Sequence, residues 1–263
     1  MIYLDWAATS KPNETLILEA VNESLDYFAN PSSYHIEGKK AKKRLEEARA
    51  NIANLLSAKT EELYFCSSAT EGVQIVFSSL LNQHFKNEII ISDNAHSATK
   101  EMAKSMQNLG YKIIVIPTNK DGFISSNTLL KSITEKTALI SLILVDNETG
   151  AIESISQIQN ELNKQNFPFA LPHLHLDCVQ ALCKIPIDFK SIKVDSAVLS
   201  AHKIGAMRGG GILYLKKPLI PFLRGGGQEN GVRAGTENLC AILSLEKCLK
   251  HLLPSIEEKR EKA

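Results

Sequence analysis

The sequence predicts an α/β fold in which helices cover both faces of a mostly parallel β-sheet. Short runs rich in β-branched residues alternate along the chain with amphipathic stretches, which is the pattern of strand–helix–strand units. At 263 residues, the chain is long enough for one large domain of this class. Its composition is that of a globular protein, with 44% hydrophobic and 22% charged residues.

Two helices are expected ahead of the first strand. Asn13 is a residue type that caps helix N-termini, and apolar residues with helical spacing follow it. The predicted face of this helix consists of Ile17, Ala20, Val21, Ser24 and Phe28. A second apolar stripe predicts a helix over residues 39–56. This stripe consists of Ala41, Leu45, Ala48, Ile52, Leu55 and Leu56, and the lysines between them are expected to face solvent.

Seven short apolar runs follow, and each is predicted to be a strand. They are Leu63–Cys66, Ile89–Ser92, Lys112–Ile116, Leu139–Val145, Leu174–Asp177, Ser196–Ser200 and Ile212–Leu215. Amphipathic stretches at 71–81, 98–109 and 154–163 are predicted to be helices that connect the earlier strands. Such connections place neighbouring strands parallel and cover both faces of the sheet.

The candidate site lies in the polar segments that follow the strands, because ligands of open α/β sheets bind beyond the carboxyl ends of the strands. These segments are 67–72, 146–150, 177–180 and 200–203. In the first one, small residues lead from a strand into a helix, whose free N–H groups and dipole favour a phosphate. Ser68 and Glu71 also have the spacing of a capping box, so a simple helix cap is the alternative. The glycine-rich nucleotide motifs are absent here, which argues against a nucleotide.

Lys203 and Asp177 are the charged residues at strand ends that suit covalent cofactor chemistry. Lys203 follows a buried run at 194–199, where its neighbours could lower the pKa of the amine and allow it to form a Schiff base. A surface lysine at the start of a flexible loop fits the same pattern. Asp177 could pair with a protonated heterocycle nitrogen, as pyridoxal phosphate requires, or it could cap a turn.

A metal site is a further alternative near Asp177. His173, His175 and Asp177 share one face of the predicted strand, because side chains alternate along a strand. Together with Cys178 they have the chemistry of metal ligands. Cys178 is expected on the opposite face, however, and no second ligand cluster is visible in the sequence. We therefore expect no metal.

Residues 225–236 form a glycine-rich loop that leads to a predicted helix start. Ordering a loop with so few side chains loses much backbone entropy, so a contact must compensate for it. Binding of a phosphate at Thr236 or packing against another subunit would compensate for the lost entropy. A mobile linker is the alternative, and the segment fits all three interpretations.

Charge and cysteine content exclude several classes of protein. Thirty Lys and Arg residues against 29 Asp and Glu residues give a net charge of +1, so neither nucleic acid nor an anionic membrane is expected as a partner. The longest apolar run is far shorter than the roughly 20 residues of a membrane span. The start of the chain does not resemble a signal peptide, and five scattered cysteines without a CxxC motif favour reduced thiols. We expect a cytoplasmic protein.

The segments at the strand ends, taken with others along the chain, resemble the pyridoxal-phosphate-dependent class V aminotransferase family. Within it they are most similar to the cysteine desulfurases of nitrogen fixation and iron–sulfur-cluster assembly. The matching segments run in family order over most of the chain, and the last two are the most specific. They are Tyr3-Leu4-Asp5-x-Ala7-Ala8-Thr9, Asn30-Pro31-Ser32-Ser33-x-His35, Ala69-Thr70-Glu71, Asn147-Glu148-x-Gly150, Asp177-x-x-Gln180, Ser200-x-His202-Lys203 and Arg233-Ala234-Gly235-Thr236-Glu237-Asn238.

The resemblance implies a role for each matching residue. Lys203 would bond covalently to the cofactor, Asp177 would bind its pyridine nitrogen, and His96 would stack on the ring, so these three are the expected catalytic residues. Gln180 would approach the phenolic oxygen of the ring, and Asn147 would orient the substrate. The expected phosphate-binding residues are Ala69, Thr70, Ser200, His202 and, from the partner subunit of a homodimer, Thr236.

The resemblance also implies the fold and the reaction. The fold would be the type I fold of pyridoxal-phosphate enzymes, a seven-stranded, mainly parallel sheet between helices. The reaction would remove sulfur from L-cysteine, or act on another small amino acid, and would leave alanine and a persulfide. The sulfur would pass to an acceptor protein for iron–sulfur clusters or tRNA thiolation.

The family pattern continues beyond the length of this chain. Family members have a small C-terminal domain that carries the persulfide-forming cysteine and an arginine for the substrate carboxylate. We therefore expect residues 1–245 to form the cofactor-binding large domain with a helical N-terminal arm, and 246–263 to begin a linker helix. Turnover by this chain is expected to be impaired. The alternatives are a catalytically inactive remnant of the fold and a class V aminotransferase that acts on another amino acid.

Overall fold

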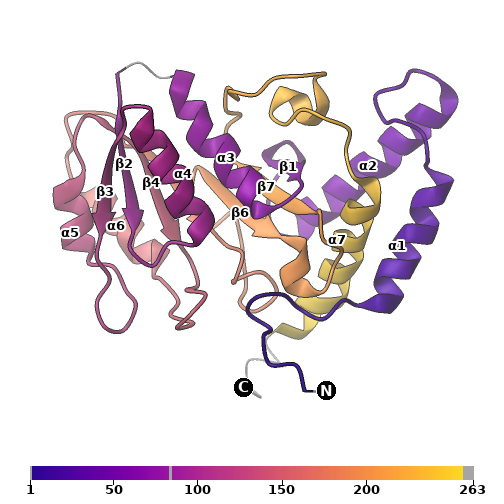
Figure 1. The fold of residues 1–263 in the computed structure, drawn as a ribbon, viewed down its shortest axis with the longest axis horizontal. Coiled ribbons are helices and arrows are strands. Elements are labelled where there is room, and N and C mark those ends of the chain that lie inside the picture. The colour runs from indigo at the N-terminus through magenta and orange to yellow at the C-terminus, as the bar shows by residue number, and fades with distance from the viewer. Residues whose placement is uncertain (1, 83–84, 257–263) are drawn as a thin grey trace.

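A single seven-stranded sheet runs through the computed structural model, which describes residues 2–82 and 85–256 (Figure 1). The strands are β1 Leu63–Cys66, β2 Glu88–Ser92, β3 Lys112–Ile116, β4 Thr137–Ile143, β5 His173–Asp177, β6 Ser196–Ser200 and β7 Gly211–Leu215. All seven predicted strands are confirmed. Their bounds differ most at β4, which ends at Ile143 although the apolar run continues to Val145.

The strand order β1-β7-β6-β5-β4-β2-β3 brings the candidate segments together. Neighbouring strands from β6 through β5, β4 and β2 to β3 are parallel, as predicted, whereas β7 is antiparallel to both β6 and β1. β1 and β6 therefore point the same way. The segments at 67–72, 146–150, 177–180 and 200–203 follow β1, β4, β5 and β6, so the topology places them at one edge of the sheet.

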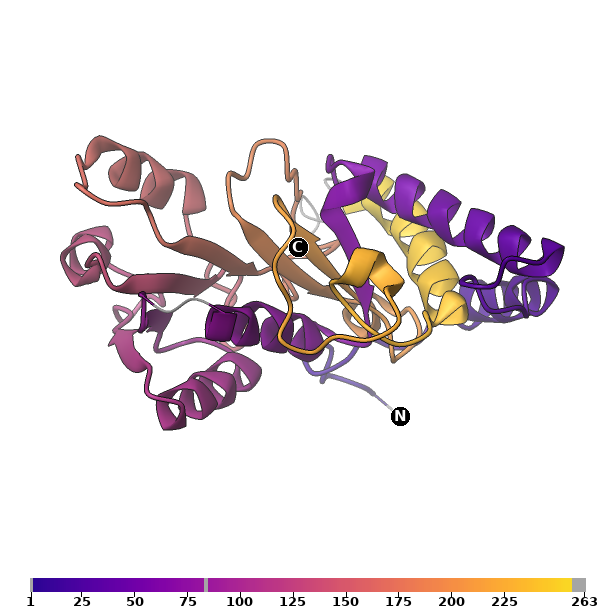
Figure 2. The same cartoon turned by 90° about the horizontal axis from the view of Figure 1, so that it is seen from above.

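Helices cover both faces of this sheet, which confirms the predicted α/β class. They are α1 Glu14–Asp26, α2 Ile36–Leu55, α3 Ala69–Ser79, α4 Ser97–Asn108, α5 Ser126–Ser132, α6 Ile155–Lys164 and α7 Leu239–Leu252. Figure 2 shows α3 and α4 on one face and α5 and α6 on the other. The helices α1, α2 and α7 group together beside the β1 end of the sheet (Figures 1 and 2).

The first helix begins as predicted but ends earlier. The side-chain oxygen of Asn13 accepts a hydrogen bond from the N–H of Leu16 at 3.2 Å, and Ala20 is fully buried. The helix ends at Asp26, so the helical period no longer applies to Phe28, which is 78% exposed. The prediction that Phe28 shares the buried face is therefore wrong.

Two hydrophobic clusters fix these layers, one on each face of the sheet. The cluster under α3 and α4 includes Tyr64, Cys66, Phe77, Ile89 and Met106. The cluster on the other face includes Ile52, Leu56, Leu176, Cys178 and Leu199. A buried large apolar side chain contributes about 1.5–3 kcal/mol, so these clusters hold the strand ends in place. Cys66 belongs to the core, as predicted, and Cys178 packs in the cluster of Leu176, which confirms that it faces away from the Asp177 side chain.

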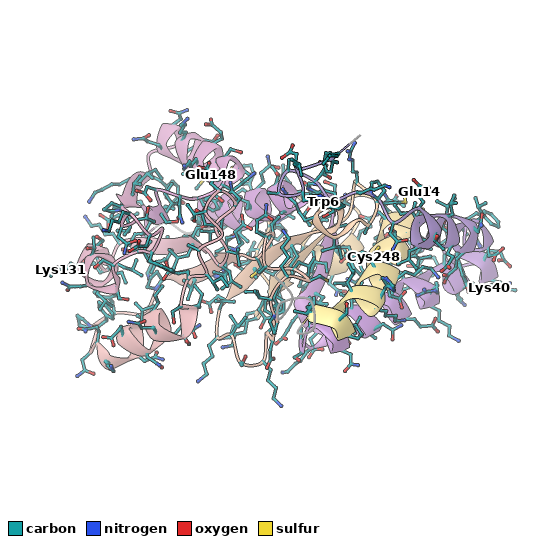
Figure 3. The ribbon with its side chains drawn as sticks, turned by 90° about the horizontal axis from the view of Figure 1, so that it is seen from below. Trp6, Glu14, Lys40, Lys131, Glu148 and Cys248 are labelled. Carbon is teal, nitrogen blue, oxygen red and sulfur yellow. The ribbon has the colours of Figure 1, made fainter. Side chains whose placement is uncertain are left out.

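The last α-helix of the described residues packs against the first two. α7 packs against α1 and α2, and its Glu246 is buried and accepts hydrogen bonds from Arg44 and Asn51 at 2.7 Å each. Figure 3 shows Cys248 on α7, while Lys40 and Lys131 project outward at opposite ends of the molecule. The predicted division between 245 and 246 falls inside α7 and stays a prediction, and 257–263 lie outside the described residues. Among the described residues, no helix has the length and apolar character needed to cross a membrane.

Candidate active site

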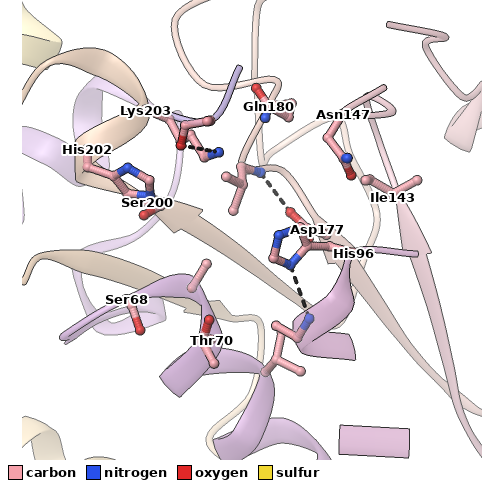
Figure 4. Close-up of a pocket in the computed structure, with 15 residues that line it drawn as sticks. Ser68, Thr70, His96, Ile143, Asn147, Asp177, Gln180, Ser200, His202 and Lys203 are labelled. Carbon is pink, nitrogen blue, oxygen red and sulfur yellow. Dashed lines mark hydrogen bonds between the residues drawn. The ribbon is translucent and has the colours of Figure 1, made fainter. Parts of the chain in front are cut away.

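A cavity of about 240 Å³ lies where the carboxyl ends of β4, β5 and β6 meet the N-terminus of α3 (Figure 4). All the predicted site residues except Thr236 line it. Its lining consists of Ala8, Ser68, Ala69, Thr70, Val73, His96, Ala98, Ile143, Asn147, Asp177, Val179, Gln180, Ser200, His202 and Lys203.

Asp177 provides a buried carboxylate at the end of β5. One of its oxygens, Oδ1, accepts a hydrogen bond from the N–H of Val179 at 2.9 Å. Burial raises the pKa of Asp177, whereas that hydrogen bond and the electrostatic effects of nearby His96 and Lys203 act in the opposite direction. A cationic partner inside the cavity would therefore stabilise the charged form of this carboxylate.

Lys203 lies in the short 3₁₀ turn Ala201–Ile204 that follows β6. Its Nζ donates hydrogen bonds to the backbone oxygens of Ala7 and Ala8, at 2.5 and 2.9 Å. Burial lowers the pKa of Lys203, while the carboxylates of Asp177 and Asp5 oppose this effect. The lowered pKa increases the fraction of neutral amine, which is the nucleophilic form.

The N-terminus of α3 forms another wall of the cavity. Ser68 caps the helix, since its Oγ accepts from the N–H of Glu71 at 3.2 Å, and the first N–H groups of the helix have no intrahelical partners. A Cβ on Gly72 would lie 2.6 Å from Val198 Cγ1, so the glycine lets the helix approach the sheet. These N–H groups and the helix dipole suit an anion.

The capping box, which was the alternative interpretation of this segment, forms only in part. The carboxylate of Glu71 accepts a hydrogen bond from the N–H of Ser67 rather than from Ser68, and it also pairs with Arg233 Nε at 2.9 Å. Burial alone would raise the pKa of Glu71, but the hydrogen bonds from Ser67 and Arg233 lower it overall. Glu71 therefore stays charged and ties the glycine-rich loop to α3.

Ser200 and His202 line the cavity where β6 ends. Ser200 is buried at the end of β6, and His202 Nδ1 lies 3.0 Å from Thr9 Oγ1. Burial lowers the pKa of His202, and the positive charge of Lys203 lowers it further. Both side chains can donate a hydrogen bond to an anion without carrying a charge of their own.

His96 and Asn147 line the open side of the cavity. His96 is the N-cap of α4, and its Nδ1 accepts a hydrogen bond from the N–H of Ala98 at 3.2 Å, which leaves Nε2 to carry the proton of the neutral ring. The imidazole is exposed and faces the cavity (Figure 4). Asn147 follows β4 in the segment that the sequence singled out.

Thr236 lies outside the cavity, on the glycine-rich loop. The loop is held by Glu229, whose carboxylate accepts from both terminal nitrogens of Arg49, at 2.6 and 2.8 Å, and from the N–H of Phe65 at 2.7 Å. Glu229 and Arg49 are both buried. These contacts disfavour the interpretation of this loop as a mobile linker.

The two histidines considered for a metal site both contact Ser196 instead. His173 Nε2 and His175 Nδ1 each lie 2.7 Å from Ser196 Oγ. Within the described part of the chain, no group of three or more His, Cys, Asp or Glu residues is arranged to hold a metal ion.

Three residues near the site were missed by the sequence analysis. Lys184 donates to Gln180 Oε1, and Arg49 and Glu229 hold the glycine-rich loop. Lys184 looked like one of many surface lysines, and Arg49 sits in a lysine- and arginine-rich helix. For Glu229, the visible signal was an acidic residue two positions after the run of three glycines at 225–227.

The fold and this cavity define the type I class of pyridoxal-phosphate enzymes. The family model for aminotransferase class V matches residues 2–263, so the chain belongs to that family, which depends on pyridoxal phosphate.

Curated relatives and solved structures agree with this assignment. The chain is 35% identical over 98% of its length to a cysteine desulfurase from a Nostoc species, and 33% identical over 99% to cysteine desulfurase IscS from Dictyoglomus turgidum. It spans 64% and 66% of those two proteins. A solved NifS-like protein matches 99% of this chain and 72% of its own with a TM-score of 0.93 and 30% identity. SspA in complex with cysteine matches 100% of this chain and 77% of its own, with a TM-score of 0.88 and 28% identity.

Proposed function

We propose that this chain binds pyridoxal 5′-phosphate in the described cavity and supports desulfuration of L-cysteine. The observation that carries the proposal is the convergence of Asp177, Lys203 and the N-terminus of α3 on one cavity. Cysteine desulfurase relatives and the cysteine-bound SspA structure support the choice of substrate.

The residues of the cavity fit this cofactor. Phosphate would bind at the N–H groups of Ala69 and Thr70, with Ser200 and His202 as further donors. The buried carboxylate of Asp177 has one oxygen engaged by Val179, and the carboxylate faces the cavity, where a protonated ring nitrogen would compensate its burial.

When bound, the cofactor supplies an electron sink for the carbanion left by loss of the substrate α-proton. Asp177 would hold the protonated ring nitrogen. The amine of Lys203 would hold the cofactor covalently, and its neutral form could accept the substrate α-proton. His96 would cover one face of the ring, and Asn147 would orient the substrate.

Sulfur transfer requires a thiolate that the described cavity does not contain. The structure describes residues 2–82 and 85–256, and among these residues no cysteine lines the cavity. Burial raises the pKa of Cys66 to about 12 and that of Cys248 to about 11, which makes both poor nucleophiles. We therefore expect residues 1–263 alone to bind the cofactor and to release little sulfide.

A borohydride experiment tests the proposal. The chain is incubated with pyridoxal phosphate, reduced, digested and analysed by mass spectrometry, and sulfide and alanine are measured after addition of L-cysteine. We expect a reduced adduct at Lys203, no adduct in Lys203→Ala, and an unchanged adduct in the control Lys190→Ala. An adduct at another lysine would contradict the cofactor site. Release of a keto acid in place of sulfide and alanine would indicate an aminotransferase, and rapid sulfide release would contradict the expected impairment.

We also propose a cytoplasmic homodimer that delivers sulfur to an acceptor protein. Thr236 lies outside the cavity of its own subunit and next to an apolar groove, so Thr236 of the partner subunit would complete the phosphate site. Within the described residues, Cys66, Cys178, Cys240 and Cys248 are free thiols, which suits a reducing compartment.

A further inference from the structure

The amide of Gln180 is held at both of its ends. The residue is 6% exposed, and its Oε1 accepts a hydrogen bond from Lys184 Nζ. Its Nε2 donates to the backbone oxygen of Ala7 at 2.9 Å. The same oxygen accepts from Lys203 Nζ at 2.5 Å, so one hydrogen-bonded network joins Lys184 to the amine of Lys203.

Both neighbours of the amide require the same orientation. An amide that rotates by 180° exchanges an acceptor for a donor, so the partners decide which end faces which side. A lysine ammonium has only donors, and a backbone carbonyl has only lone pairs. Lys184 therefore fixes Oε1 on its own side, and the NH₂ group must face Ala7.

The orientation leaves one N–H of Gln180 for the cavity. The NH₂ group carries two hydrogens, and Ala7 takes one of them. Gln180 lines the cavity, so the remaining hydrogen is available to an oxygen of a bound ligand. The cation on Oε1 polarises the amide and strengthens this donor.

We propose that Lys184 is a positioning residue, which fixes the amide of Gln180 so that the cavity meets a hydrogen-bond donor and not an acceptor. The inference rests on the proposed function, because the phenolic oxygen of pyridoxal phosphate is the ligand atom that needs such a donor. The inference assigns a role in cofactor binding to Lys184, which does not line the cavity.

The local backbone places Lys184 where it can do this. The N–H of Lys184 donates to Ala181 at 3.0 Å, and that of Leu182 donates to Cys178 at 3.1 Å, so a tight turn carries the chain from Gln180 to Lys184. Lys184 itself is exposed. Its replacement therefore removes the hydrogen bond without opening the core.

The first test uses the chain without cofactor. Glutamine side chains are labelled with ¹⁵N, the Gln180 signals are assigned from their loss in Gln180→Leu, and hydrogen exchange of the NH₂ group is measured. We expect at least about tenfold faster exchange in Lys184→Met, and wild-type exchange in Lys184→Arg and in Lys190→Met, an exposed lysine on the same connection. Unchanged exchange in Lys184→Met would overturn the proposed orientation.

The second test compares pyridoxal phosphate with its 3-deoxy analogue, which lacks the phenolic oxygen. We expect Lys184→Met to bind pyridoxal phosphate about three- to tenfold more weakly, to bind the analogue unchanged, and to be restored in Lys184→Arg. In the Gln180→Leu background, Lys184→Met should have no further effect. Equal loss for both ligands, or loss without Gln180, would overturn the inference. Failure of the wild-type chain to bind either ligand would refute the proposed function, while the exchange experiment would still decide the orientation.

Discussion

Burial acts in opposite senses on the two charged residues of the cavity. It lowers the pKa of Lys203 and raises that of Asp177, so it favours the neutral form of both. Each charge partly offsets the effect on the other. A cationic ring nitrogen beside Asp177 would stabilise the charged carboxylate in place of the Lys203 ammonium, so Lys203 could act as a neutral amine.

Replacing Asp177 by Asn should therefore change the pH dependence of Lys203. The carboxylates of Asp177 and Asp5 raise the pKa of Lys203 against burial, so removal of the Asp177 charge lowers that pKa further. The rate of adduct formation with pyridoxal phosphate follows the neutral amine, and its midpoint should move to lower pH in Asp177→Asn. Asp5 is exposed, and Asp5→Asn should give a smaller shift in the same direction. A shift to higher pH in Asp177→Asn would contradict the pairing.

At the scale of elements, the glycine-rich loop depends on one buried ion pair. Arg49 on α2 bonds Glu229 through two nitrogens, and Glu229 also accepts from Phe65 of β1. Glu229 and Asn230 have φ values of 47° and 53°, in the left-handed region that non-glycine residues rarely adopt. The hydrogen bonds of the Glu229 carboxylate compensate this backbone conformation.

Glu229→Ala should lower the free energy of unfolding by about 3–5 kcal/mol, because it leaves the Arg49 charge buried without its main partner. Urea denaturation measures the change. Glu46 also pairs with Arg49, at 3.0 Å, but its side chain is 47% exposed. Glu46→Ala is the matched control and should cost less than about 1 kcal/mol. Similar losses in both variants would show that burial of the Glu229 pair is unimportant.

Local sequence signals predicted the helices and strands, but they did not predict contacts between residues far apart in the sequence. Runs such as Ser196–Ser200 become strands because their own apolar residues fill the core, and Asn13 caps α1 through a neighbour on the same turn. The end of β4 was misplaced because Leu144 and Val145 are apolar and still pack against the core after the strand ends. Periodicity cannot distinguish a buried loop residue from a strand residue.

In the site, too, local signals identified some residues and missed those that depend on long-range contacts. Asp177 and Lys203 were predictable as neighbours because Asp177 ends β5 and Lys203 lies in the turn that follows β6, and parallel strands bring their carboxyl ends together. Glu229 and Arg49 are far apart in the sequence, and nothing local marks them as partners. The contact of Lys184 with Gln180 depends on the folded position of the Gln180 side chain, which the sequence does not show.

At the scale of the whole molecule, an apolar groove on the face of α3 and α4 predicts self-association. The groove, of about 580 Å³, lies between these helices and the glycine-rich loop, and its lining includes Met102, Leu109, Phe222 and Leu223. Phe222 is 53% and Leu223 75% exposed. Such apolar surface next to the Thr236 loop suits a second copy of the chain.

Leu223→Asp should weaken the proposed dimer at least tenfold, because it would place a charge in the apolar contact. Sedimentation of the cofactor-loaded chain at several concentrations measures this. The matched control is Leu25→Asp, on the exposed side of α1 and 67% exposed. A monomer at all concentrations, or equal effects of both substitutions, would refute this interface.

Stability of the molecule should fall on acidification through His175. This ring is fully buried, and in the described structure its Nε2 has no hydrogen-bond partner. Burial lowers the pKa of His175 to about 3, and the positive charge of His173 adds to this effect. Below pH 6.5 the unfolded chain therefore binds a proton that the folded chain excludes, so the free energy of unfolding falls by up to about 1.4 kcal/mol per pH unit until about pH 3.

His175→Asn removes this titration and isolates its contribution. Lowered carboxylate pKa values, such as that of Glu246, also reduce stability in acid, but they act mainly below about pH 5. The difference in unfolding free energy between wild type and His175→Asn should stay constant from pH 8 to 7 and then shift by roughly 1 kcal/mol per unit in favour of the variant between pH 6 and 5. Urea melts across this range measure the difference. A constant difference down to pH 5 would mean that water or a relaxed fold lets His175 take up its proton in the native state.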